Sequence, residues 1–183
     1  CFHVDATQAA GKIPLDAVMQ ADLVSLAPHK FCGLKGCGIL VKKRNIILEP
    51  LIHGGASTTL YRSGTPDVPA AAACAEALKL AVQKLPERTE HVRKLNQFLR
   101  ENLLQNSGIR INSPEHAVPH ILNVSVNGIK GEEMRRRLGS RNVCISVKSA
   151  CSVPNTPSRA VMALTHDRKN ALSSWRISLS HLT

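Results

Sequence analysis

The chain has 183 residues and a formal net charge of +11, with 43% hydrophobic and 3% aromatic residues. No apolar run reaches the length of a membrane span, and the basic residues are spread out with no nucleic-acid motif, so we expect neither a membrane nor a nucleic acid as a partner. The six cysteines show no regular disulfide framework and no standard zinc spacing, which favours reduced thiols in the cytoplasm and no metal site.

The first part of the chain predicts a sheet. Its short apolar runs are typical of strands covered on both faces, as in α/β folds. We expect strands over residues 2–6, 22–26 and 36–43, and a short helix over 15–20. Residues 51–69 predict a long functional loop, followed by an alanine-rich helix over 70–85 that begins near Val68 and Pro69.

The second part of the chain changes pattern, with strands interleaved with helices, which predicts a small α+β domain. Apolar residues at three- and four-residue spacing predict an amphipathic helix over 87–105. The further expected elements are strands over 109–111, 121–126, 143–146 and 175–179, and helices over 131–138 and 157–164. We place the domain boundary after residue 88, which gives domains 1–88 and 89–183.

Chemically important side chains follow the first two predicted strands. Lys30 lies where a strand meets a glycine-rich turn, and Asp5 and Gln8 lie at the end of the preceding strand. Ligands bind at strand termini in open α/β sheets. A lysine, an acid and glycine-rich turns are what an aldehyde cofactor that forms a Schiff base requires, since they supply the amine, the partner of the pyridine ring and the phosphate site. On its own, a lysine in this position is more often a surface lysine beside a turn.

Six sequence blocks, taken in order, resemble cysteine desulfurases of the NifS type, which are pyridoxal phosphate (PLP) enzymes of the class V aminotransferase superfamily. The blocks are Phe2-His3-Val4-Asp5-Ala6-Thr7-Gln8, His29-Lys30 with the following glycine turn, His53-Gly54-Gly55, Arg62-Ser63-Gly64-Thr65-Pro66, Ser149-Ala150-Cys151-Ser152 and Arg176-Ile177-Ser178-Leu179. The resemblance implies part of an aspartate aminotransferase-like large domain plus a small α+β C-terminal domain. Compared with the family, roughly the first half and a C-terminal tail are missing, so we expect a fragment.

The resemblance implies a cofactor role for five residues. Lys30 would form the Schiff base and move protons, Asp5 would bind the pyridine nitrogen, and Gln8 would bind the phenolate oxygen. His29 would contact the phosphate, and Thr65 would reach the phosphate of a partner subunit, which implies a homodimer. Each also has an ordinary structural reading, such as a strand-end turn or a solvated surface.

The chain departs from the family pattern in two places near the lysine. Ala27 stands where a Ser or Thr often contacts phosphate, and Leu34 replaces the usual Pro of the glycine turn. One phosphate hydrogen bond is therefore in question, and the turn is expected to be looser.

The resemblance also implies two residues that act on substrate. Cys151 would accept sulfur on a mobile loop, with Lys148 beside it as a possible influence on the thiol. Arg176 would pair with the substrate carboxylate. Cys144, in an apolar segment, fits a buried inert thiol better.

The parent enzyme would convert L-cysteine to L-alanine and an enzyme-bound persulfide, and pass the sulfur to an acceptor or scaffold protein. The alternatives are a selenocysteine lyase or another class V enzyme, and a non-enzymatic truncated binding module. We expect the fragment alone to bind cofactor weakly and to be inactive.

Overall fold

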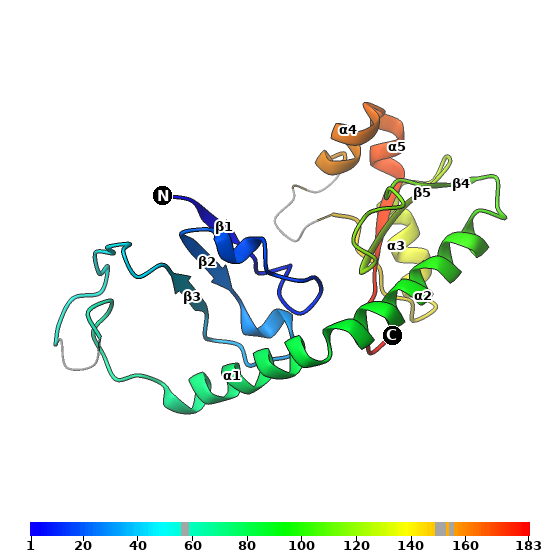
Figure 1. The fold of residues 1–183 in the computed structure, drawn as a ribbon. Helices are drawn as coiled ribbons and strands as arrows, with labels where there is room; N and C mark the ends of the chain where they lie inside the picture. Colours follow the sequence, from blue (N-terminus) through cyan, green and yellow to red (C-terminus); the bar gives the residue numbers. More distant parts are fainter. Residues whose placement is uncertain (56–58, 149–152, 154–155) are drawn as a thin grey trace. The chain divides into compact units, whose positions relative to one another are not determined.

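A computed structural model describes residues 1–55, 59–148, 153 and 156–183. The chain divides into two compact units, Cys1–Pro86 and Glu87–Thr183, each of which contains a three-stranded sheet (Figure 1). Within the described ranges, no helix combines the length and the apolar character needed to cross a membrane.

The sheet of the first unit consists of β1 (His3–Asp5), β2 (Leu23–Leu26) and β3 (Ile39–Lys42), in the order β1-β2-β3. β1 and β2 run parallel, with Asp5 opposite Ser25, while β3 runs antiparallel to β2. The three predicted strands are confirmed, and each is shorter than expected. The parallel pair matters most, because it brings the carboxyl ends of β1 and β2 to one edge of the sheet.

The helical segments of the first unit pack on one apolar core. That core contains buried Val24, Leu26, Phe31 and Ala81, with Ala77 and Leu78 packed against it. α1 (Val68–Gln83) starts as predicted, since the Asp67 carboxylate caps it by accepting a hydrogen bond from the Ala70 N–H at 3.0 Å.

The predicted helix over 15–20 is wrong in extent. Only Val18–Gln20 forms a 3₁₀ helix. Gly11 has φ +74°, and a Cβ there would lie 2.9 Å from the Phe31 Cβ, so a glycine-dependent turn precedes this segment. A second 3₁₀ helix, Pro28–Lys30, follows β2 and carries the lysine.

The second unit contains most of α2 (Leu85–Leu103) and an antiparallel sheet of β4 (Ile109–Ile111), β5 (Ile121–Val126) and β6 (Ser174–Ser178), in the order β4-β5-β6. Its other helices are α3 (Gly131–Gly139), α4 (Arg159–Thr165) and α5 (Arg168–Ser173). Leu122 and Val124 alternate along β5 and are fully buried, and the largely buried Trp175 packs with them. Residues of α2 and α3 complete this core, namely Leu99, Leu103, Met134 and Leu138.

One predicted strand of this unit and one burial assignment are wrong. Residues 143–146 form no strand, since only Ser146 pairs with Arg176 in an isolated bridge. Cys144 is exposed rather than buried. A turn in which Asn142 has φ +60° precedes the segment, and the chain reaches the sheet only at Ser146.

The helical region that follows is also divided differently from the prediction. α4 begins at Arg159 because the Ser158 hydroxyl accepts from the Val161 N–H. His166, with φ +51°, ends α4, and Asp167 then caps the unpredicted helix α5.

Candidate active site

Lys30 is held at the carboxyl end of β2 between two buried anchors. Pro28 and Phe31 are both buried, while His29 and Lys30 between them are exposed. The Lys30 N–H donates to the Ala27 oxygen at 3.0 Å, and the Phe31 N–H donates to the Pro28 oxygen at 3.0 Å. The backbone around the lysine is therefore fixed, while its amine is accessible to a ligand.

Gly33 closes the turn after the lysine. Its N–H donates to the Pro28 oxygen at 2.8 Å. A Cβ at this position would lie 2.8 Å from the Pro28 Cβ, 3.0 Å from the Pro28 oxygen and 3.2 Å from the Ala77 Cβ. Only glycine fits between the lysine-bearing segment and α1 without displacing one of them.

Asp5 ends β1 at the edge of the sheet where Lys30 follows β2. The strand pairing continues past Asp5, since the Ala6 N–H donates to the Ser25 oxygen at 2.9 Å. Hydrogen bonds from Thr7, through its side chain first and its backbone N–H second, hold the pKa of Asp5 below its ordinary value. The carboxylate therefore stays ionised, as a partner of a protonated ring nitrogen must.

Gln8 and Lys30 share a neighbour that the sequence analysis missed. Lys12 donates from Nζ to Gln8 Oε1 at 2.9 Å and to the Gln8 backbone oxygen at 3.2 Å. Burial first, and the charge of Lys30 second, lower the pKa of Lys12. The four-residue spacing from Gln8 to Lys12 was the available signal, because side chains four apart meet on one turn of helix-like chain.

We call Asp5, Gln8, His29 and Lys30 the strand-end cluster. Its four members lie at the carboxyl edge of the parallel pair and are exposed. Ser25 does not take the place of the hydroxyl missing at Ala27, since its Oγ is hydrogen-bonded to His3 Nε2 at 2.7 Å.

Thr65 is exposed and follows Gly64, which has φ +101°. In the described part of the chain, no hydrogen bond joins Thr65 to the strand-end cluster. Its predicted role toward a partner subunit stays a prediction.

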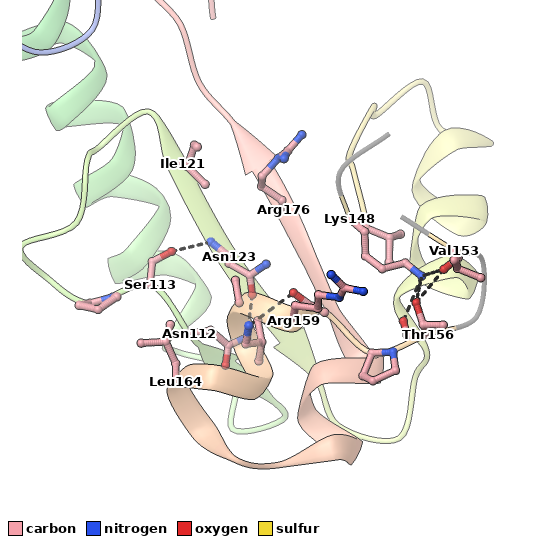
Figure 2. A pocket seen from close by; sticks show the side chains of 16 residues that line it. Asn112, Ser113, Ile121, Asn123, Lys148, Val153, Thr156, Arg159, Leu164 and Arg176 are labelled. Carbon is pink, nitrogen blue, oxygen red and sulfur yellow. Dashed lines mark hydrogen bonds between the residues drawn. The ribbon is translucent and has the colours of Figure 1, made fainter. Parts of the chain in front are cut away.

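Arg176 lies on a cavity of about 900 Å³ within the second unit (Figure 2). It projects from β6 beside Asn123 of β5, its partner in the strand register. Arg176 is half-buried, and its Nε donates to Ser178 Oγ at 3.1 Å. The backbone of Arg176 is fixed on its other side by two hydrogen bonds with Ser146, at 2.6 and 3.1 Å.

The cavity is positively charged. Lys148, Arg159 and Arg176 line it, and none of its sixteen lining residues is acidic. Asn123 is oriented by Asn112, which donates from Nδ2 to Asn123 Oδ1 at 2.8 Å. Such a lining favours a small anion such as a carboxylate.

Arg159 was missed by the sequence analysis, although a signal existed. It stands in the first turn of α4, where a cation is unfavourable to the helix dipole. A residue in a place that costs helix stability is a reasonable candidate for a binding role.

In the described structure, Lys148 donates hydrogen bonds to oxygen atoms of Val153 and Thr156. Its Nζ donates to the Val153 oxygen at 2.7 Å, to the Thr156 oxygen at 3.0 Å and to Thr156 Oγ1 at 3.2 Å. Cys151, the predicted sulfur acceptor, lies outside the described residues.

No group of three or more His, Cys, Asp or Glu side chains that could hold a metal ion occurs in the part of the chain that the structure describes.

The chain belongs to the class-V aminotransferase family, because the family model described as "Aminotransferase class-V" matches residues 1–183. A "Cysteine desulfurase IscS" of Mannheimia succiniciproducens is 38% identical over all of this chain and 46% of its own length. A "Cysteine desulfurase, mitochondrial" of Eremothecium gossypii is 37% identical over all of this chain and 38% of its own length.

A solved structure titled "NIFS-LIKE PROTEIN" covers 98% of this chain and 47% of its own chain, with 35% identity and a TM-score of 0.83. The predicted α/β fold of the NifS-like enzymes is confirmed. The chain spans about half the length of the relatives that it matches. Our placement of the chain in the C-terminal half of the family, and of residues 89–183 in the family's small domain, stay predictions.

Proposed function

We propose that this chain is part of a PLP-dependent cysteine desulfurase. The observation that carries the proposal is the parallel pairing of β1 with β2, which brings an ionised Asp5 and an exposed Lys30 to the same edge of one sheet. Relatives named cysteine desulfurase, similar over the whole chain, support it.

The strand-end cluster fits PLP in the chemistry of its donors. Lys30 would supply a primary amine for the cofactor aldehyde and would move a proton at the substrate carbon. Asp5 would keep the ring nitrogen protonated, Gln8 would bind the phenolate oxygen, and His29 would contact the phosphate. PLP, when bound, supplies an electron sink for the bonds at that carbon.

The Arg176 cavity fits the substrate carboxylate. Its guanidinium can bind a carboxylate through two parallel hydrogen bonds, and the other cations of the lining raise the local affinity for anions. In this proposal Cys151 takes the sulfur of L-cysteine, which leaves L-alanine and a persulfide for an acceptor or scaffold protein.

The assembly and location that we propose follow from the same family. Thr65 would complete the phosphate site of a second copy in a homodimer. We place the enzyme in the cytoplasm because its cysteines show no disulfide framework, and we note that one relative is named as mitochondrial.

The alternative activity of a selenocysteine lyase is not favoured, because the two relatives described above are both named cysteine desulfurase.

The test is to trap the cofactor on the chain. We expect incubation with PLP, followed by borohydride reduction and peptide mapping, to place the stable adduct on Lys30. Lys30→Ala should remove the adduct, whereas Lys35→Ala, which removes an exposed lysine of the same turn, should leave it unchanged.

A label spread evenly over Lys12, Lys30 and Lys35, or retained in full by Lys30→Ala, would contradict a dedicated cofactor lysine. Sulfur release from L-cysteine by the full-length enzyme is a separate measurement. It should disappear in Cys151→Ala, and its survival would argue for a different class V reaction.

A further inference from the structure

Two cysteines of the first unit lie in contact, one in the glycine turn that follows Lys30 and the other in α1. Cys37 Sγ and Cys74 Sγ are 2.8 Å apart, whereas a covalent S–S bond is about 2.05 Å long. Cys37 stands between Gly36 and Gly38 before β3, and Cys74 lies within α1. We propose that Cys37 and Cys74 are a site of reversible disulfide formation that ties the glycine turn after Lys30 to α1.

The two backbones that carry these thiols are already packed together. Gly33 lies against Ala77 one turn further along α1, where a Cβ would be 3.2 Å from the Ala77 Cβ. Ala77 and Ala81, on the same face of α1 as Cys74, pack into the core that contains Phe31. Closing the S–S bond therefore requires a small approach of two held sulfur atoms rather than a rearrangement of the unit.

The two thiols differ in access, which sets the order of the reaction. Cys37 is partly exposed, and Cys74 is buried at 5% exposure. The hydrogen bond with Cys37, and then burial, raise the pKa of the Cys74 thiol. Cys37 is therefore the sulfur that meets an oxidant from solution, and Cys74 is the sulfur that completes the bond.

The oxidant that we propose is a small disulfide such as oxidised glutathione. The Cys37 thiolate attacks one sulfur of oxidised glutathione and releases one glutathione thiolate. Cys74 then loses its proton and attacks the Cys37 sulfur, which releases the second glutathione. Two protein thiols are oxidised, one glutathione disulfide is reduced to two thiols, and reduced glutathione reverses both steps.

This site is independent of the proposed function, because neither thiol belongs to the strand-end cluster. Its effect on Lys30 does rest on that function, since the crosslink would stiffen the turn that follows the cofactor lysine. Intracellular disulfides of this kind are usually transient and redox-sensing rather than structural.

The experiment is oxidation of the 183-residue chain in buffers of graded oxidised to reduced glutathione. We expect the intact mass to fall by two hydrogen atoms and a non-reducing digest to contain the Cys37–Cys74 linked peptide. Amide hydrogen exchange of residues 33–38 should slow in the oxidised form, and the Tm should rise by several degrees because the unfolded chain is crosslinked.

The variants separate this pair from the other thiols. Cys37→Ser, and Cys74→Ala as an apolar change at the buried position, should each abolish the loss of two hydrogens. Cys32→Ser, which removes an exposed thiol of the same segment, should preserve it. A glutathione adduct that persists on Cys37 in the wild-type chain, or a linked peptide that contains a different pair, would overturn the proposal. If the linked peptide forms but PLP is not trapped on Lys30, the proposed disulfide site is supported and the proposed cofactor function is not.

Discussion

Gly33 occupies a space in which a methyl group has no room. The hypothetical Cβ would approach two atoms of Pro28 to 2.8 and 3.0 Å. We expect Gly33→Ala to lower the free energy of unfolding by roughly 1–3 kcal/mol, because the lysine-bearing turn must separate from α1. Urea denaturation measures this change. The matched control is Gly139→Ala, since a Cβ there meets nothing within 4 Å. An equal loss in both variants would show that the contact with Pro28 is not the cause.

At Arg176, the contribution of positive charge to carboxylate binding can be measured separately from the contribution of hydrogen-bond geometry. Lysine keeps the positive charge but loses the two parallel hydrogen bonds that a guanidinium makes to a carboxylate. We expect Arg176→Lys in the full-length enzyme to raise KM for L-cysteine about tenfold with a smaller change in kcat. Arg110→Lys is the control, since Arg110 lies on β4, outside the Arg176 cavity, and pairs with Asp167. If steady-state kinetics show the same KM for both variants, Arg176 does not bind the carboxylate.

Residue positions could be predicted from sequence where a strand end defined them. Asp5 and Lys30 each follow a short apolar run, and the structure brings the ends of those runs together. Lys12 and Arg159 do not follow a strand end, so the same rule could not identify them. Their positions depend on the fold of the turn that carries Lys12 and of the short helix α4 that carries Arg159. Cys144 was misjudged because its apolar neighbours suggested burial that the exposed segment does not provide.

At the scale of elements, Asp22 joins the three strands of the first sheet. Its carboxylate accepts from the Phe2 N–H at 2.8 Å and from Lys43 Nζ at 3.0 Å. These hydrogen bonds, that of Phe2 first, hold the pKa of Asp22 below its ordinary value of 3.8. A depressed carboxyl pKa contributes stability that is present above the unfolded value and is lost as the pH falls through the folded value.

We therefore expect Asp22→Asn to lower the Tm at neutral pH, and the difference from the wild-type chain to shrink as the pH falls below 3.8. Thermal unfolding over a series of acidic pH values measures this. Asp16→Asn, at an exposed position, should follow the wild-type curve throughout. A difference that stays constant down to the acid limit would mean that ionisation of Asp22 contributes nothing.

The predicted bounds of helices and strands agree with the structure where the local sequence signal is strong. β4 and β5 have the predicted bounds, and α1 begins where Asp67 can cap it. The failures lie where tertiary contacts decide. Residues 143–146 have the apolar pattern of a strand, but only Ser146 finds a strand partner, so the pattern alone was insufficient.

For the whole molecule, each unit has a core built from its own residues among those that the structure describes. Val24 is buried in the first core and Val124 in the second, at 1% and 0% exposure. We expect Val24→Ala and Val124→Ala each to destabilise its own unit by about 2 kcal/mol, through lost apolar contact and a residual cavity. Hydrogen exchange should speed up mainly in the mutated unit. Equal acceleration across both units for either variant would show that they unfold as one.

The parallel pairing of β1 with β2 has a consequence for biosynthesis. Asp5 and Lys30, which are proposed to hold the cofactor, are joined by a short segment of the chain. Closing the loop between them therefore costs little conformational entropy. Contacts of low sequence separation form early, and a nascent chain can make them before distant segments leave the ribosome. We therefore expect this part of the proposed cofactor site to form before the other residues of the site have been synthesised.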